Sequence, residues 1–164
     1  MTKDSKYSSL NSGYALLTQN GETLQLTSKS DRFHQFQYQL YHYAALGIKF
    51  QDSLSGKHVL DLCCGRGGGL AFLTRHFKAA SALGIDFSSH SISTAQDKYT
   101  EVENLSYAHG DVESLAQVEG VEGKQFDLVT CIESYHCLRN EGAVLKQAYE
   151  AMHKEGSFVI ADAF

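Results

Sequence analysis

The chain has 164 residues, of which 43% are hydrophobic and 20% are charged. This length suits one domain with a substantial core and is short for a two-domain enzyme. The formal net charge is -5, from 14 basic and 19 acidic residues. That balance disfavours a nucleic-acid partner, because binding to a phosphate backbone needs a basic face.

The first 55 residues are predicted to form a cap segment, 1–55, ahead of the main domain. Within 14–26, Asn20-Gly21 separates two partly alternating runs, which is typical of a hairpin. A helix over the same residues stays open, because Leu and Ala dominate them.

From Asp31 onward, apolar residues recur at three- and four-residue steps, which predicts an amphipathic helix over about 31–47. The apolar stripe of this helix would consist of Phe33, Phe36, Leu40, Tyr43, Ala44 and Ile48. Tyr38, Tyr41 and His42 flank the stripe, either as ordinary boundary residues or as the lining of a pocket.

After residue 56 the chain alternates short apolar strands with helices. The expected strands are 58–62, 82–85, 105–108, 126–132 and 157–161, and the expected helices are 70–77, 91–99 and 141–153. Alternation at this spacing implies right-handed crossovers and a doubly wound parallel sheet with helices on both faces. Residues 56–164 are therefore predicted to form a single α/β domain.

A glycine-rich loop follows the first of these strands and reads Asp61-Leu-Cys-Cys-Gly-Arg-Gly-Gly-Gly69. In a strand–loop–helix unit, backbone N–H groups at the helix start can meet a ligand closely. Glycines allow that approach and the positive φ of a tight turn. Such loops also bind dinucleotides, and some merely turn, so the loop alone does not name its ligand.

Carboxylates stand where three of the predicted strands end, at Asp61, Asp86 and Asp111. The carboxyl ends of parallel strands share the edge of the sheet at which ligands bind, and the residue at Asp86 would take ribose hydroxyls there. Three carboxylates would repel a pyrophosphate but suit a ligand with a cationic amine. This favours S-adenosylmethionine over NAD, although Asp86 and Asp111 could instead cap turns or helices.

The runs HVLDLCCGRGGG, LGID, AHGDVESL, FDLVTCIESYHCL and EGSFVIADAF resemble the motifs of class I S-adenosylmethionine-dependent methyltransferases. The segment 133–137 is most similar to that of small-molecule O-methyltransferases of the phthiotriol dimycocerosate type. The resemblance covers 56–164 and implies a Rossmann-like methyltransferase fold with strand order 3-2-1-4-5. It also implies S-adenosylmethionine as cofactor, S-adenosylhomocysteine as product and a hydroxyl-bearing small molecule as acceptor.

The cofactor-binding residues that the resemblance implies are Asp61, Cys63, Gly65, Gly67, Asp86, Phe87, Asp111, Val112 and Ile132. By this resemblance Asp61 would hold the methionine amino group, Asp86 the two ribose hydroxyls and Asp111 the adenine amino edge. Ile132 and Glu133 would border the transferred methyl group.

The first position of the loop departs from the family pattern. Gly65 and Gly67 would let the backbone pass the methionine part of the cofactor, but the family usually has glycine where Cys63 stands. We expect a cysteine to be tolerated there if its φ stays negative, at the cost of a narrower approach to the methionine carboxylate.

Methyl transfer depends on alignment of donor and acceptor and on removal of a proton from the acceptor atom. His136 is our first choice for that base, because the pKa of histidine lies near working pH, and Glu133 is the second. Alternatively, both are solvated loop residues with only local hydrogen bonds.

Four cysteines, Cys63, Cys64, Cys131 and Cys137, lack the C-x-x-C spacing of a zinc site. We therefore expect reduced thiols and no metal. No run approaches the roughly 18 apolar residues of a membrane span, and no leader-like segment opens the sequence, so a soluble cytoplasmic protein is expected.

The family normally continues past the fifth strand with two more strands and acceptor-binding insertions, whereas this sequence ends at Phe164. The apolar run 158–161 would then be an exposed edge, which invites pairing. We expect a homodimer, a partner chain or the 14–26 hairpin to cover it, unless the chain is a truncated product. Two other functions stay open: an S-adenosylmethionine-binding regulatory or scaffold subunit without activity, and an NAD-type oxidoreductase.

Overall fold

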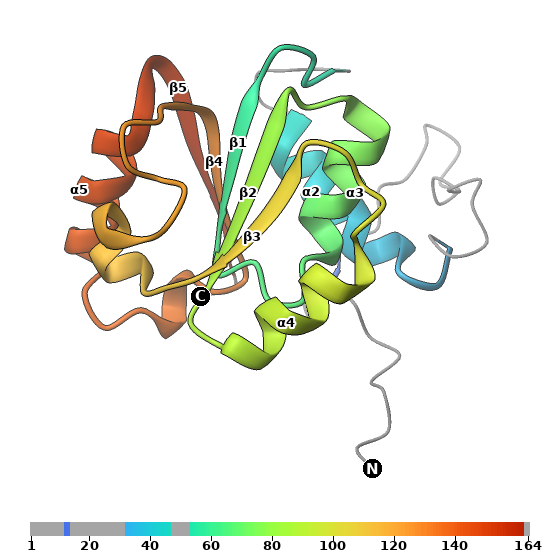
Figure 1. Cartoon of the computed structure of the whole chain (residues 1–164), viewed down its shortest axis with the longest axis horizontal. Coiled ribbons are helices and arrows are strands. Elements are labelled where there is room, and N and C mark those ends of the chain that lie inside the picture. Colours follow the sequence, from blue (N-terminus) through green and yellow to red (C-terminus); the bar gives the residue numbers. More distant parts are fainter. Residues whose placement is uncertain (1–11, 14–31, 47–52, 163–164) are drawn as a thin grey trace.

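A computed structural model describes residues 12–13, 32–46 and 53–162 (Figure 1). All five strands are parallel and form one sheet in the predicted order, β3-β2-β1-β4-β5. The strands are β1 His58–Leu62, β2 Ser81–Asp86, β3 Leu105–His109, β4 Phe126–Ile132 and β5 Met152–Ala161. The helices are α2 Gln35–Ala45, α3 Gly68–Phe77, α4 Ser89–Lys98 and α5 Glu141–Ala151, with the 3-10 helices η2 Val112–Gln117 and η3 Tyr135–Cys137.

Helices cover both faces of the sheet, with α2, α3 and α4 on one side and η2 and α5 on the other (Figure 1). Successive strand residues point to opposite faces, so each face has its own apolar core. Val59 and Leu128 belong to the core under α2 and α3, whereas Leu60 and Val129 belong to the core under η2 and α5. Burial on both faces explains why the strands read as nearly continuous apolar runs.

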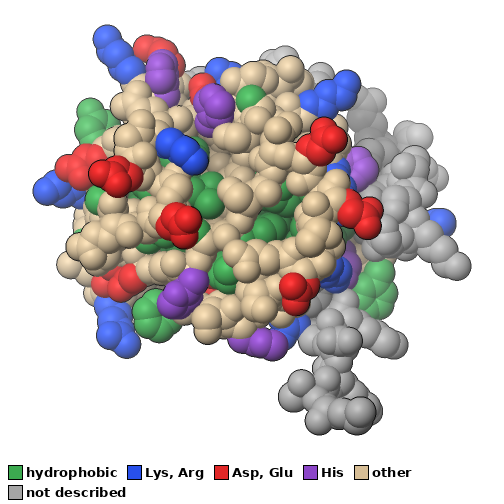
Figure 2. Space-filling model, in the orientation of Figure 1, with side chains coloured by type: hydrophobic (Ala, Val, Ile, Leu, Met, Phe, Trp, Pro, Cys, Tyr) green, Lys and Arg blue, Asp and Glu red, His purple; other side chains and the backbone are tan. Residues whose placement is uncertain are grey.

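The described residues allow only some of the predictions for the N-terminal segment to be compared with the structure. The hairpin predicted for 14–26 lies outside them, and α2 falls within the range 31–47 for which a helix was predicted. Among the helices that the structure describes, none has the length and apolar character needed to cross a membrane. Figure 2 shows Lys and Arg side chains scattered among Asp and Glu on the displayed face, without a basic patch.

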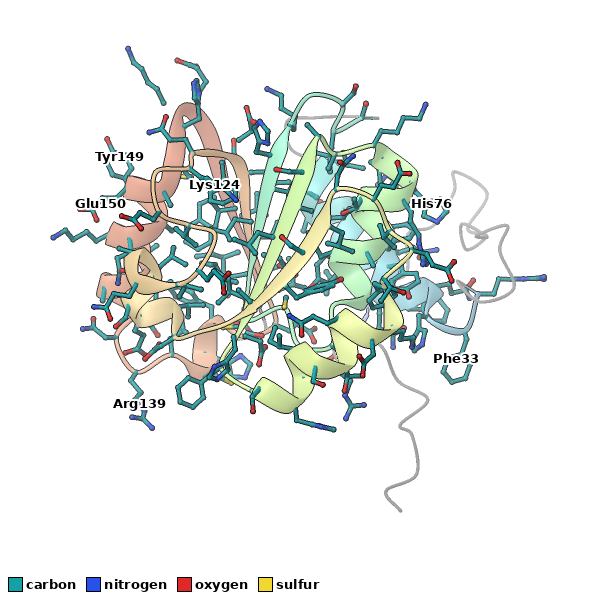
Figure 3. All side chains as sticks on the ribbon, in the orientation of Figure 1. Phe33, His76, Lys124, Arg139, Tyr149 and Glu150 are labelled. Carbon is teal, nitrogen blue, oxygen red and sulfur yellow. The ribbon has the colours of Figure 1, made fainter. Side chains whose placement is uncertain are left out.

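The apolar stripe predicted for α2 is right for Ala44, which is buried, and for Leu40, which packs against the core, but wrong for three other members. Three of its members are largely exposed: Phe33 at 58%, Phe36 at 41% and Tyr43 at 50%, and Figure 3 shows Phe33 pointing outward. The buried aromatic side chains of α2 are instead Tyr38 and Tyr41, and the Tyr38 ring stacks on Phe72 of α3 with ring centroids 4.7 Å apart. The reason is close helix packing at a glycine, because a Cβ on Gly69 would lie 2.1 Å from the Tyr41 ring.

The boundary between α5 and β5 also differs from the prediction. The helix ends at Ala151 rather than His153, and β5 begins at once with Met152. Its pairing with β4 is irregular between Phe126 and Leu128, where β5 has extra residues. Gly156 lies in this irregular stretch, and a Cβ there would come within 2.9 Å of the Phe126 carbonyl oxygen. Glycine thus permits the close approach of β5 to β4 ahead of residue 157, where the strand was predicted to begin.

The turn into α3 depends on Gly67. Its φ is +76°, and a Cβ would lie 2.4 Å from Cζ of Tyr107, whose hydroxyl donates to the Gly67 carbonyl oxygen at 2.7 Å. We expect Gly67→Ala to lower the free energy of unfolding by about 3 kcal/mol, since it adds overpacking to a left-handed backbone. Equilibrium urea denaturation measures this loss.

Gly123 provides the matched control, because its φ is +69° but no atom lies within 4 Å of an added Cβ. Gly123→Ala is expected to cost only the backbone strain, about 1 kcal/mol. Equal losses for the two variants would contradict a role of the Tyr107 ring at Gly67.

Candidate functional site

A cavity of about 460 Å³ opens where β1 to β4 end, at the lower edge of the sheet in Figure 1. Its wall comes from the glycine loop and the start of α3, the turn after β2, the residues after β3 and those after β4. Tyr41 of α2 completes the wall. The carboxyl edge of a doubly wound sheet is where ligands bind in this architecture.

Three backbone N–H groups of the glycine loop are engaged by the protein. Gly65 donates to Asp86 Oδ2 at 2.8 Å, Cys64 to the Ile85 carbonyl at 2.9 Å, and Gly67 to the Cys64 carbonyl at 3.1 Å. A loop that cradles phosphate instead points such donors at its ligand. Gly65 lines the cavity, whereas Gly67 packs against Tyr107.

Cys63 lines the cavity, but its φ is +57°, not negative as expected from the sequence. The chain turns sharply where β1 ends, and the next turn residue with such a backbone is Gly65 at +56°. A left-handed backbone costs a residue with a Cβ about 1–2 kcal/mol. The loop thus keeps the conformation of a glycine at this position and places a thiol on the cavity wall.

Asp86 is held at the cavity wall by two backbone donors. Its Oδ2 accepts from Gly65, and its Oδ1 accepts from Ser88 N–H at 2.9 Å. Each carboxylate oxygen accepts more than one hydrogen bond, so both can still accept from a ligand. Phe87, which is 75% exposed, lines the cavity next to it.

Asp111 both lines the cavity and caps η2, where its Oδ1 accepts from Glu113 N–H at 2.9 Å. Val112 adds a buried apolar side chain to the wall. Glu113 also lines the cavity, and the sequence did not predict it. Its Oε1 accepts from Arg139 N–H at 2.7 Å. The available signal was its position two residues beyond Asp111, at the same strand end.

Asp61 is completely buried and lies behind the cavity wall. It faces α2 because Val59, two residues earlier, belongs to the core on that side. Register places it beside Thr130, whose hydroxyl donates to Oδ1 at 2.6 Å, while the Tyr41 hydroxyl donates to Oδ2 at 3.0 Å. Tyr41, rather than Asp61, therefore reaches the cavity. Of the two interpretations of Tyr41, boundary residue or pocket lining, the second is correct.

Burial raises the pKa of Asp61 from 3.8 to about 7, although its hydrogen bonds from Thr130 and Tyr41 act in the opposite direction. The native protein thus binds a proton here that the unfolded chain releases, so stability falls as pH rises from about 4 to about 7. Between pH 5 and pH 8 we expect this carboxyl group to reduce the free energy of unfolding by about 2 kcal/mol. Urea unfolding of the wild type and of Asp61→Asn at both pH values measures the contribution. If the free energy of unfolding of Asp61→Asn fell between the two pH values as much as that of the wild type, the contribution of Asp61 would be contradicted.

The two bases predicted after β4 lie in different surroundings. Glu133 lines the cavity, and its carboxylate accepts from the Ser12 N–H. His136 is exposed and does not line the cavity. Its ring Nδ1 lies 2.7 Å from Asp162 Oδ1, and its backbone N–H donates to Asp162 Oδ2 at 3.0 Å. The structure therefore brings Glu133, together with Ile132, to the cavity wall and does not bring His136 there.

The charge of the cavity wall is acidic. Its ionisable carboxylates are Asp86, Asp111, Glu113 and Glu133. The guanidinium that accompanies them, on Arg139, extends outward at the lower left of Figure 3. Such a wall favours a cation and repels a pyrophosphate. Across the described part of the chain, no three His, Cys, Asp or Glu side chains are placed to hold a metal ion.

Residues 59–156, more than half of the chain, match the family model described as a methyltransferase domain. The chain belongs to this family. The methyltransferase domain is 33% identical over 139 residues to a probable phthiotriol/phenolphthiotriol dimycocerosates methyltransferase 2 of Mycobacterium ulcerans, covering 85% of this chain and 49% of that protein. It is 31% identical over 136 residues to a fatty-acid O-methyltransferase of Mycolicibacterium smegmatis, covering 83% and 46%.

The fold of the methyltransferase domain is found in solved structures. Coclaurine N-methyltransferase, bound to N-methylheliamine and SAH, matches with a TM-score of 0.64 at 18% identity, over 91% of this chain and 40% of that one. At this identity the likeness concerns the fold, which is Rossmann-like. The methyltransferase domain spans about half the length of the curated relatives it matches.

Proposed function

We propose that this domain is an S-adenosylmethionine-dependent methyltransferase that acts on a hydroxyl of a small-molecule acceptor. The observation that carries the proposal is the acidic wall of the cavity beside a glycine loop in which the N–H groups of Cys64, Gly65 and Gly67 already have acceptors within the protein. A donor with a sulfonium and an ammonium group suits that wall, and a pyrophosphate does not. The printed names of the relatives in the same family support methyl transfer.

The donor-binding role belongs to 56–164, and the cap segment 1–55 contributes Tyr41 to the wall. Asp86 would accept from the ribose hydroxyls, and Asp111 with Val112 would meet the adenine edge. Asp61 would act on the methionine amino group from behind Tyr41, whose hydroxyl it already binds. The residues present fit the ribose and adenine parts of the donor, because Asp86 and Asp111 line the cavity, whereas Asp61 would act on the amino group only through the Tyr41 hydroxyl.

When bound, S-adenosylmethionine supplies an electrophilic methyl group on its sulfonium. Ile132 would border that methyl group, and Glu133 would take the proton of the acceptor hydroxyl. His136 is the alternative base, although it lies outside the cavity lining. An oxygen acceptor is supported by the name of one relative, a fatty-acid O-methyltransferase.

Titration calorimetry with S-adenosylmethionine, S-adenosylhomocysteine and NAD tests the proposed ligand. We expect the first two to bind and NAD not to bind. Release of S-adenosylhomocysteine in the presence of hydroxylated lipids and phenols then tests catalysis. Donor binding without release across the panel would favour a regulatory or scaffold subunit, and binding of NAD alone would favour an oxidoreductase.

The assembly and location of the protein are part of the same proposal. Within the described residues, β5 pairs with β4 on one side only, and we propose that a second copy or a partner chain covers the other edge of β5. We also propose that the protein acts in the cytoplasm. Light scattering at several concentrations measures the oligomeric state. A monomer at every concentration would contradict the homodimer.

A further inference from the structure

Cys63 and Cys131 form a thiol pair at the cavity wall. Cys131 lies on β4 as the register partner of Leu62, the residue before Cys63. The side chain of Cys131 is completely buried, whereas Cys63 is half-buried and lines the cavity. Cys63 packs against the core cluster that contains Cys131, so both side chains lie on the same face of the sheet.

The neighbouring Cys64 does not share this contact, although it is adjacent in sequence. Cys64 belongs to the core under α2 and α3, and its thiol donates to the Gly65 carbonyl oxygen at 3.7 Å. Cys63 packs against the opposite core, which contains Cys131. The two successive cysteines therefore serve opposite faces of the sheet, and only the first meets a second thiol.

The geometry of the pair suits a covalent bridge. Cys63 lies one residue beyond Leu62, the register partner of Cys131. With strands about 4.8 Å apart and a rise of about 3.3 Å per residue, this offset corresponds to a Cα separation of about 6 Å, within the range of about 4.4–6.8 Å found for bridged cysteines. The left-handed backbone of Cys63 stores strain at the cavity wall, where a residue other than glycine needs a compensating reason.

The two thiols have different roles in such a reaction. The interaction with Cys63 and then burial raise the pKa of the Cys131 thiol, so Cys131 keeps its proton. Cys63 faces the cavity, which a small oxidant can enter. The thiolate is the nucleophile in thiol oxidation, so Cys63 reacts first and Cys131 second.

We propose that Cys63 and Cys131 are a redox modification site, oxidised by hydrogen peroxide to a disulfide that weakens donor binding in the adjacent cavity. The Cys63 sulfur attacks one peroxide oxygen, the O–O bond breaks, and hydroxide leaves as water after taking the Cys63 proton. The Cys131 sulfur then attacks the resulting sulfenic acid. The S–O bond breaks, and the second hydroxide takes the Cys131 proton. Two thiols thus lose two electrons to one peroxide, which becomes two waters.

The disulfide would hold the Cys63 sulfur against β4 and thereby change the loop that fixes Asp86 through Gly65 N–H. The existence of the bridge is independent of the proposed function, whereas its effect on donor affinity rests on it. We expect oxidation to weaken S-adenosylmethionine binding about tenfold, and reduction with dithiothreitol to restore it.

Peptide mapping after treatment with equimolar hydrogen peroxide tests the bridge. Trypsin leaves Cys63 with Cys64 in 58–66 and Cys131 with Cys137 in 125–139. We expect these two peptides to be cross-linked in the wild type, in Cys64→Ala and in Cys137→Ser. Cys131→Ala and the volume-conserving Cys131→Val are expected to lose the cross-link.

A cross-link that needs Cys64 or Cys137, or none in the wild type, would overturn the proposed site. Calorimetry of the same samples then separates the remaining outcomes. If the reduced protein binds the donor and the bridged protein binds it equally well, the effect on the cavity is refuted. If the reduced protein binds no donor, the proposed function fails, while the mapping result stands by itself.

Discussion

Asp86→Ala is expected to weaken S-adenosylmethionine binding about 100-fold. The carboxylate lies at the cavity wall, held by Gly65 N–H and Ser88 N–H, and would accept from two ribose hydroxyls. Each hydrogen bond to a charged group contributes about 1.5–3 kcal/mol, and about 1.4 kcal/mol corresponds to a tenfold change in affinity. The variant also leaves the backbone N–H groups of Gly65 and Ser88 without their acceptor. Titration calorimetry measures the affinity.

Two further variants separate charge from shape. Asp86→Asn keeps one acceptor oxygen in a side chain of the same size and is expected to lose about tenfold. Asp97→Ala removes an exposed carboxylate of α4 outside the cavity lining and is expected to leave the affinity unchanged. Thermal melts of each variant control for unfolding. An affinity of Asp86→Ala within about threefold of the wild type would remove Asp86 from the donor site.

Glu133→Gln is expected to lower turnover about 100-fold while donor affinity stays close to that of the wild type. A positioned general base contributes about 10²–10⁴-fold to rate, and the amide cannot take up a proton. The substitution preserves size and an oxygen that can accept from Ser12 N–H, so the local contact is retained. Release of S-adenosylhomocysteine with a hydroxylated acceptor measures turnover.

His136→Ala is the matching test of the other base. The ring lies outside the cavity lining and contacts Asp162, so we expect turnover to fall by less than about tenfold. A larger loss in His136→Ala than in Glu133→Gln would reverse the assignment and make His136 the base. Losses of similar size in both would favour a shared proton path through this loop.

Much of the architecture follows from local patterns in the sequence. The short apolar runs alternate with helical segments, and this alternation predicted the parallel sheet, whereas its order was implied by the resemblance to methyltransferases. The carboxyl ends of parallel strands meet at one edge by geometry alone. For this reason Asp86, Asp111 and Ile132 could be assigned to a common cavity without knowledge of any contact.

Residues whose roles depend on long-range packing could not be placed in this way. The helix α2 carries aromatic residues around much of its circumference, so its periodicity did not indicate which of them face α3. Gly69, which makes room for the Tyr41 ring, is distant in sequence from α2. The same contact buries Asp61 beneath Tyr41, a placement that spacing along the chain does not reveal.

The sequence by itself thus determined the α/β class, the glycine loop and most of the carboxylates around the cavity, because neighbouring residues encode strand ends and turns, while the strand order came from the family resemblance. Tertiary structure alone decided that Asp61 lies behind Tyr41, that His136 turns to Asp162, and that Cys63 packs against the core that contains Cys131. The physical reason is side-chain direction, which depends on φ at single positions and on which surfaces pack together.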